Sequence, residues 1–139
     1  MSQDRAEVVR RVIDALNRGD VDGAMEATSP DCVIDWSNSR GPLRGVYHGR
    51  DEAREAWKSF LEVWASVRWD VREFVELEDD RVVIASEFRT RGQGSGVEVS
   101  ARGASLWTIR DDEVAAVALY QSKAEALEAA AGQGSATNP

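Results

Sequence analysis

Two residues near the end of a short apolar segment could carry out acid–base chemistry. Asp35 follows Ile34 and precedes Trp36, and His48, the one histidine of the chain, lies further along the same stretch. An aspartate that points into an apolar interior can act as a general base. The residue types also allow a structural interpretation, in which Asp35 caps the strand end and binds amides around 37–39 while His48 is a solvated loop residue.

Aromatic residues form the second group of candidate site residues. The chain has five tryptophans among 139 residues, a high number for so small a domain. Each buried indole N–H needs a hydrogen-bond partner, which a ligand or water could provide. The alternative is that these rings are ordinary core residues. The candidates for a ligand-binding wall are Trp36, Tyr47, Trp57, Phe60, Trp64, Trp69 and Trp107.

Other common chemistries are disfavoured by the sequence. Gly92, Gly94 and Gly96 have the wrong spacing for a dinucleotide fingerprint and precede a predicted strand, so a hairpin loop is expected. One histidine and one cysteine make a zinc site improbable, and no loop has the spacing of a carboxylate metal site. We therefore expect no metal and no cofactor. Cys32 has no activating base nearby in sequence and is interpreted as a small buried hydrophobe.

The elements that must position these residues begin with helices. An apolar stripe at helical spacing predicts a first helix, with Gly19 as its stop and Asp20 as the N-cap of a short second helix. A third helix is predicted from about 51 to 64. A short, Ala/Glu-rich helix is predicted over 123–131. The first stripe consists of Val8, Val9, Val12, Ile13 and Leu16.

Strands follow from residues that alternate between apolar and polar. The predicted strands are 32–36, 67–77, 81–91, 97–110 and 114–121. Phe74 falls out of phase with Trp69 and Val71, which indicates a bulge near residues 73 and 74. Residues 37–49 are predicted as a long loop of the kind that often carries function.

Helices first and strands afterwards predict an α+β fold, with helices packed on one face of a curved antiparallel sheet. The length favours a single domain over 1–131. Residues 132–139 are expected to form a flexible C-terminal tail.

The composition limits the kinds of partner that the protein is expected to bind. The formal net charge of −8 argues against a nucleic-acid binder, which needs clustered Lys and Arg. No apolar run approaches the roughly 18–20 residues of a membrane span, so no membrane partner is expected. The N-terminal stretch has no apolar signal region, and a lone cysteine allows no internal disulfide. A cytoplasmic location is expected.

The order of elements and several local motifs resemble a known superfamily. The motifs are "ALNRGDVDGAMEATSPDCVIDW", "GVYHGRDEAREAWKSFLEVW", "DRVVIASEFRTRG" and "SLWTIRDDEVAAVALYQSKAEALEAA", which together span roughly residues 5–130. On these motifs the chain resembles a SnoaL-like member of the nuclear transport factor 2-like superfamily, which includes ketosteroid isomerase.

The resemblance implies a cone-shaped α+β barrel, in which a strongly bent mixed or antiparallel sheet wraps around the long third helix. It also implies a pocket and, often, a homodimer formed through the outer face of the sheet. Asp35 is similar in position to the general base of ketosteroid isomerase, whose oxyanion hole combines a tyrosine and a protonated aspartic acid. This chain aligns Val12 and Ser105 with those two donors, so isomerisation in the known manner is not expected. Tyr120 joins Ser105 as a candidate pocket residue.

These observations leave three hypotheses about function. The first is a cofactor-independent acid–base enzyme of isomerase, cyclase or hydratase type, with Asp35 as base and His48 as a further catalytic candidate. The second is a non-catalytic binder of a small apolar molecule. The third is a dimeric interaction module with a vestigial pocket. The superfamily hosts all of these roles, so the fold by itself does not choose among them.

Overall fold

The computed structural model describes residues 5–37, 45–77 and 79–137, with side chains described as far as Gly132. The helices are α1 (Arg5–Asn17), α2 (Val21–Glu26), α3 (Gly49–Val63) and α4 (Lys123–Thr137). The strands are β1 (Thr28–Asp35), β2 (Val46–His48), β3 (Trp64–Glu76), β4 (Arg81–Gly92), β5 (Glu98–Arg110) and β6 (Glu113–Tyr120). No helix in these ranges is long and apolar enough to cross a membrane.

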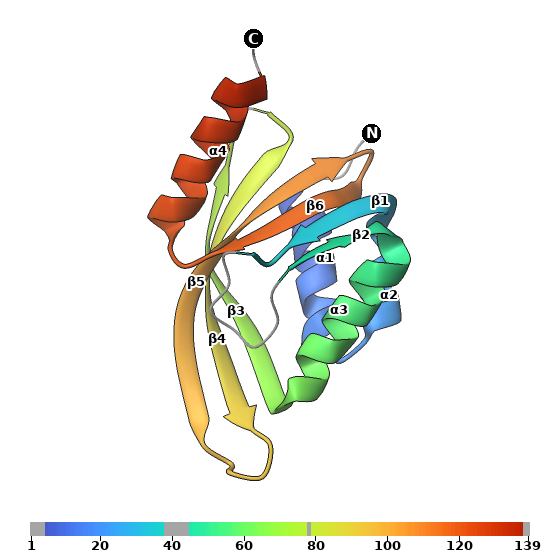
Figure 1. Cartoon of the computed structure of the whole chain (residues 1–139), viewed down its shortest axis with the longest axis vertical. Coiled ribbons are helices and arrows are strands. Elements are labelled where there is room, and N and C mark those ends of the chain that lie inside the picture. The colour runs from blue at the N-terminus through green and yellow to red at the C-terminus, as the bar shows by residue number, and fades with distance from the viewer. Residues whose placement is uncertain (1–4, 38–44, 78, 138–139) are drawn as a thin grey trace.

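The strands form one curved sheet in the order β2-β1-β6-β5-β4-β3. The pairing of β1 with β6 is parallel, and all other pairs are antiparallel. Helices α1, α2 and α3 lie on one side of the sheet, and α4 lies on the other side (Figure 1). The predicted α+β fold with a bent, mixed sheet is confirmed.

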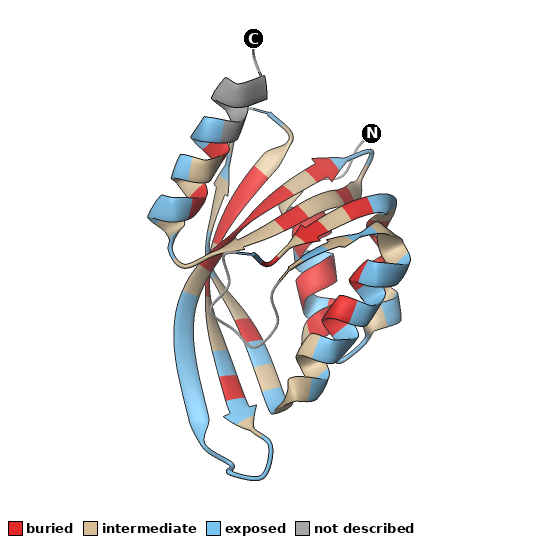
Figure 2. Ribbon diagram, in the orientation of Figure 1, coloured by how far each residue is buried: buried red, intermediate tan, exposed pale blue. Residues whose placement is uncertain are grey.

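The two faces of the sheet carry separate cores. The inner face, which packs against α1–α3, includes Ile34, Val82 and Trp107. The outer face, which packs against α4, includes Val83 and Leu106. Residues directly opposite each other in paired strands share a face. The strand register therefore assigns each of the remaining strand residues to one of these two faces. Buried positions concentrate where α1–α3 and α4 cover the sheet (Figure 2).

The predicted caps of the first two helices are confirmed. Gly19 has φ of 76°, in the left-handed region that a glycine after a helix can adopt without strain. The Asp20 carboxylate accepts a 2.9 Å hydrogen bond from the backbone N–H of Gly23, as an N-cap residue does. All five residues of the predicted apolar stripe on α1 are buried in the inner core.

The predicted bulge in β3 is also confirmed. Val71 pairs with Ser86, but Glu73 pairs with Ala85, so one extra residue enters β3 at this point. The shift returns Phe74 to the inner face, where the guanidinium of Arg10 lies 4.6 Å from its ring centroid.

Several element boundaries differ from the sequence prediction, and the differences are largest at β1, β2 and α4. Strand β1 begins at Thr28, and the last part of the predicted loop 37–49 forms β2, while residues 38–44 lie outside the described residues. Helix α4 continues to Thr137, so the predicted helix end at Ala131 is wrong. Glycine such as Gly132 lowers helix propensity by about 1 kcal/mol but does not forbid helical backbone. Of the predicted tail, 138–139 lie outside the described residues.

Candidate functional site

A cluster of aromatic rings lies between α3 and the inner face of the sheet. Trp36 contacts Trp57 and Tyr47 at centroid distances of 5.3 and 5.5 Å, both edge to face. Trp69 stacks on Phe88 at 4.9 Å. The members of this aromatic cluster are Trp36, Tyr47, Trp57, Phe60, Trp69, Phe88 and Trp107.

Two periodicities bring these rings together. Ala53, Trp57 and Phe60 recur at helical spacing on α3, so they face the sheet together. On the strands, every second residue faces α3, which places Trp69 opposite Phe88 in the β3–β4 register. The sequence predicted seven aromatic residues for the ligand-binding wall. Six of them, all except Trp64, lie in this one cluster.

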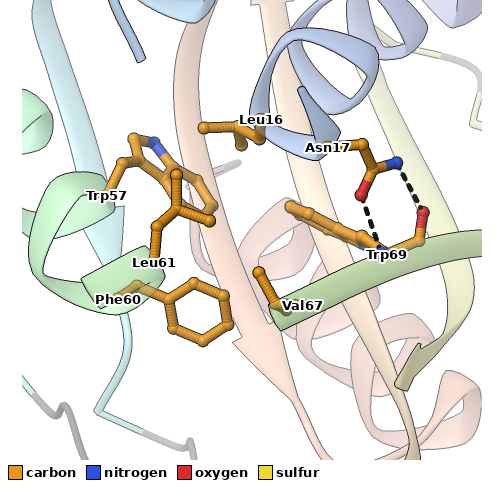
Figure 3. A pocket seen from close by; sticks show the side chains of 7 residues that line it. All are labelled: Leu16, Asn17, Trp57, Phe60, Leu61, Val67 and Trp69. Carbon is orange, nitrogen blue, oxygen red and sulfur yellow. Dashed lines mark hydrogen bonds between the residues drawn. The ribbon is translucent and has the colours of Figure 1, made fainter. Parts of the chain in front are cut away.

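A small cavity of about 10 Å³ lies at one side of the aromatic cluster (Figure 3). Its volume corresponds to about one water molecule. Its wall is mainly apolar, with the side-chain amide of Asn17 as the polar exception. The lining residues are Leu16, Asn17, Trp57, Phe60, Leu61, Val67 and Trp69.

Asn17 holds the backbone of Trp69, whose side chain lines this cavity. Its side-chain N–H donates to the backbone oxygen of Trp69 at 3.0 Å, and its side-chain oxygen accepts from the backbone N–H of Trp69 at 2.8 Å (Figure 3). Strand β3 is the edge of the sheet, so the amide supplies the two bonds that a further strand would have made. This long-range role of Asn17 has no local sequence pattern.

Four buried side-chain polar atoms have no hydrogen-bond partner within the described residues, and one of them, the indole nitrogen of Trp64, lies outside the aromatic cluster. The other three lie beside these rings and are the indole nitrogens of Trp36 and Trp69 and the hydroxyl of Ser86. The exposed fractions of these residues are 1%, 4% and 4%. A buried polar group without a partner costs about 1–3 kcal/mol, so each of these groups calls for a partner such as a water molecule or a ligand.

The indole of Trp107, also on the inner face, differs because its donor is satisfied. Trp107 donates from its indole N–H to the hydroxyl oxygen of Ser105 at 2.7 Å, and both residues are fully buried. Ser105 therefore lies in the interior, as expected, with its oxygen already accepting one bond. Ser86 was not a candidate from sequence, although its place in phase with Ile84 and Phe88 marks a polar residue on an apolar face.

The inner face of β5 becomes less bulky along the strand. Going from the covered end towards the hairpin, the inner positions are Trp107, Ser105, Gly103 and Ala101. Gly103 is half-buried and Ala101 is exposed, although both lie on the face that α3 covers elsewhere. Small side chains therefore leave this part of the inner face less covered next to Phe88, which is paired with Ala101.

Asp35 lies on the opposite face from these groups. It is paired with Ala118, Ala118 is paired with Leu106, and Leu106 belongs to the outer core. The strand phase therefore contradicts the expectation that Asp35 points into the cone, because a shift of one residue along a strand reverses the face. Trp36 takes the inner position. The Asp35 carboxylate accepts hydrogen bonds from the backbone N–H and hydroxyl of Ser37, at 2.9 and 2.5 Å, as the structural interpretation expects.

His48 lies on the same outer face as Asp35. It pairs with Val33, two residues before Asp35 on β1, and its side chain is exposed. It is also the N-cap residue of α3, where its backbone N–H donates to a carboxylate oxygen of Glu52 at 2.9 Å. The structure thus brings the two catalytic candidates to one face and separates them from the aromatic cluster.

Two other candidates lie outside the aromatic cluster. Tyr120 packs in the outer core against α4, because its strand phase matches that of Ala104. Trp64 lies at the junction of α3 and β3, where its backbone oxygen accepts a bond from Gln93 at 3.3 Å. Trp64 makes no ring contact with the cluster in the described part of the chain.

A surface groove of about 590 Å³ lies where β2 meets the first turns of α3. It combines apolar side chains with three carboxylates that suit the positive end of the helix. The lining residues are Val46, Tyr47, Asp51, Glu52, Glu55, Ala56 and Ser59. Since Tyr47 also belongs to the aromatic cluster, this groove adjoins the interior.

Cys32 is buried in the inner core, as expected for a small hydrophobe. Burial raises the pKa of its thiol, and the nearby positive charge of Arg50 only partly opposes that effect. A thiol held protonated is a poor nucleophile. Across residues 5–37, 45–77 and 79–137, no group of three or more His, Cys, Asp and Glu residues is placed to hold a metal ion.

Comparisons with known proteins fit this geometry. The chain matches the SnoaL-like domain model over residues 9–117. A search of curated proteins finds no match. Solved structures share the fold at low identity. A putative SnoaL-like polyketide cyclase from Jannaschia sp. CCS1 is 20% identical, with a TM-score of 0.71 over 86% of this chain and 90% of that one.

Two further structures are similar to the same extent. TerC, co-crystallised with polyporic acid, is 20% identical, with a TM-score of 0.73 over 89% of this chain and 95% of that one. The epoxide hydrolase/cyclase-like enzyme SalBIII is 18% identical, with a TM-score of 0.72 over 84% and 88%. At these identities the structures show a shared fold. The family match covers most of the chain, and on that ground the chain belongs to the SnoaL-like domain family.

Proposed function

We propose that this protein binds a small, largely apolar molecule that carries a hydrogen-bond acceptor. We place the site on the inner face of the sheet, where the aromatic cluster borders Gly103 and Ala101 of β5. The observation that carries the proposal is the pair of buried indole donors, Trp36 and Trp69, that have no partner among the described residues. A non-catalytic binder is favoured over an enzyme because both titratable candidates, Asp35 and His48, belong to the outer face.

The chemistry of the unpaired groups defines the ligand class. An indole nitrogen can donate a hydrogen bond but cannot accept one, so these donors select a ligand oxygen such as a carbonyl. The hydroxyl of Ser86 can donate to the same kind of atom. The surrounding rings favour an apolar body that can pack edge to face or in offset stacks. The relative that was co-crystallised with polyporic acid supports a ligand of this kind.

A titration with two matched probes tests the proposal. We expect 1-tetralone, which has a ketone, to bind more tightly than tetralin, which has the same rings without the oxygen. Changing Trp69→Phe keeps an aromatic ring and removes the donor. It should weaken 1-tetralone binding by about 3- to 10-fold, the size of one hydrogen bond, and leave tetralin binding unchanged. Ligand-observed NMR gives both dissociation constants.

Trp107→Phe is the matched control. Its indole donor is already bonded to Ser105, so its loss should not change the preference for the ketone. Equal binding of the two probes by the unaltered protein would contradict the proposal. If neither probe binds, the interaction-module hypothesis becomes the better account and the binding proposal fails.

A second candidate function is acid–base catalysis by Asp35 and His48. The observation that favours it is their common face, on paired strands, where Val33 opposite His48 lies two residues from Asp35. Diagonal positions of this kind lie within about 7–8 Å of each other, close enough for both groups to act on one small substrate. The reaction would be proton transfer next to a carbonyl, or a related cyclisation or hydration.

Exchange of the α-protons of 1-tetralone in D₂O distinguishes the two functions. A catalyst would accelerate the exchange, and Asp35→Asn would then reduce the accelerated rate by about 10²- to 10⁴-fold. Asp31→Asn, a change of an exposed carboxylate on the same strand, is the control. For the favoured binder we expect no acceleration and no effect of either substitution on affinity. A large, Asp35-dependent rate would reverse the preference.

Two further parts of the function remain proposals. We propose a cytoplasmic location, which the lone buried cysteine supports, because one thiol forms no internal disulfide. We also propose that the protein is a homodimer, as the family resemblance implies, but formed away from the outer face of the sheet, which α4 partly covers.

A further inference from the structure

The hairpin of β4 and β5 extends past the end of β6, while β3 continues to pair with β4 on the other side. The β5–β6 pairing ends at Ala104 opposite Tyr120, whereas the β4–β5 pairing continues to Arg91 opposite Glu98. Within the described part of the chain, residues 98–102 therefore have a neighbouring strand on one side only, and all five are exposed. In Figure 2 this half of β5 is a continuous exposed segment along the side of the molecule.

The strand register shows which backbone groups are free along this edge. The N–H of Gly92 donates to the oxygen of Val97 at 3.0 Å, and the N–H of Ile109 donates to the oxygen of Asp80 at 2.8 Å. In both bonds the group on the β5 side belongs to an odd-numbered residue. The backbone N–H and C=O groups of odd-numbered residues therefore point towards β4. Because the bonding direction alternates along an antiparallel strand, the N–H and C=O of Glu98, Ser100 and Arg102 point away from β4.

This edge lacks three of the usual protections against pairing with another strand: lysine, proline and, among the described residues, a covering element. Natural edge strands are protected by charged side chains, above all lysine, by proline or by a covering element. Residues 97–103, "VEVSARG", contain neither residue type, and Val97 and Val99 are 60% and 53% exposed. An uncovered, β-branched edge of this kind is suited to pairing with a partner strand.

We propose that the partner is a second copy of this chain, paired antiparallel about a two-fold axis at Ser100. In this register Glu98 lies directly opposite Arg102 of the second copy, and the same pair repeats across the axis. Two opposite-charge pairs therefore form from one five-residue segment, with Ser100 exchanging backbone hydrogen bonds with its own copy. This self-complementary order of charges is what selects a second copy over an unrelated partner.

Both ends of the free edge fit this register. At one end Ala104 pairs with Tyr120, so β6 closes the edge there, and an added Cβ on Gly103 would lie 3.3 Å from the backbone oxygen of Tyr120. At the other end Gly96 has φ of 68°, and the chain turns away from the strand there. The pairing uses the whole segment between these two limits. It also leaves the outer face of the sheet, which α4 partly covers, outside the contact.

Charge reversal combined with sedimentation equilibrium tests the proposal. We expect the unaltered protein to form dimers, and we expect Glu98→Arg or Arg102→Glu to raise the dimer dissociation constant by about tenfold, since each places two pairs of like charges opposite each other. The double variant with both changes should restore dimerisation. Loss of the Arg91–Glu98 ion pair, 3.2 Å long within one chain, cannot explain such a recovery, because the double variant lacks it too.

Ser100→Pro gives a second, independent measurement. It removes an N–H that points away from β4, so the hairpin should remain folded while the dimer weakens. Circular dichroism checks the fold. A protein that is monomeric at all concentrations would overturn the proposal, and so would a dimer that none of these substitutions weakens.

Discussion

Replacing Trp107 with alanine is expected to lower the free energy of unfolding by about 3–5 kcal/mol, the usual cost of removing a large buried ring. Trp107 has no exposed surface and contacts Trp69 at a centroid distance of 5.8 Å. The substitution leaves a cavity in the inner core and also removes the donor to the buried hydroxyl of Ser105. Urea denaturation followed by circular dichroism gives the change.

The control for this prediction is a substitution at an exposed apolar residue. Val97→Ala removes apolar atoms from a side chain that is 60% exposed, and its effect should stay within about 0.5 kcal/mol. Trp107→Phe should give an intermediate loss, because most of the ring contact remains. A similar loss for Trp107→Ala and Val97→Ala would show that the aromatic cluster is not the main stabilising core.

Changing Asn17→Leu is expected to lower the free energy of unfolding by about 2 kcal/mol, although leucine is the more apolar residue. The two hydrogen bonds to the backbone of Trp69 are lost, and the edge of β3 keeps a donor and an acceptor without partners. The substitution should also increase the rate of hydrogen exchange at the Trp69 amide more than at the neighbouring amides. Native-state exchange by NMR measures both effects.

Asp14→Leu is the matched control, since Asp14 lies one turn earlier on α1 and is exposed. It introduces the same side chain without removing a bond to β3. Equal stability of the two variants, or an unchanged exchange rate at Trp69, would contradict the role assigned to Asn17.

The short-range features of the fold could be read from the sequence. The stripes of α1 and α3, the stop at Gly19 and the cap at Asp20 each depend on residues within a few positions of one another. The bulge in β3 was also visible, because Phe74 breaks a local alternation. These features are determined by backbone geometry and side-chain periodicity, which act within a single element.

The candidate site was only partly predictable. The apolar rings were found because inner positions alternate along each strand, and most of them meet in one cluster. The orientation of Asp35 was not found, because the local sequence shows a carboxylate between two apolar residues without showing which face is covered. A displacement of one residue decides between a buried base and an outer-face carboxylate.

The sequence alone therefore determined the α+β class, the main helices and strands, and the apolar composition of the interior. Only the tertiary structure decided the faces of Asp35 and His48, the bonds from Asn17 to Trp69 and the free edge of β5. The physical reason is the range of the interactions. Periodicity and capping are local, whereas the covered face, the unpaired donor and the open edge depend on which distant segments pack together.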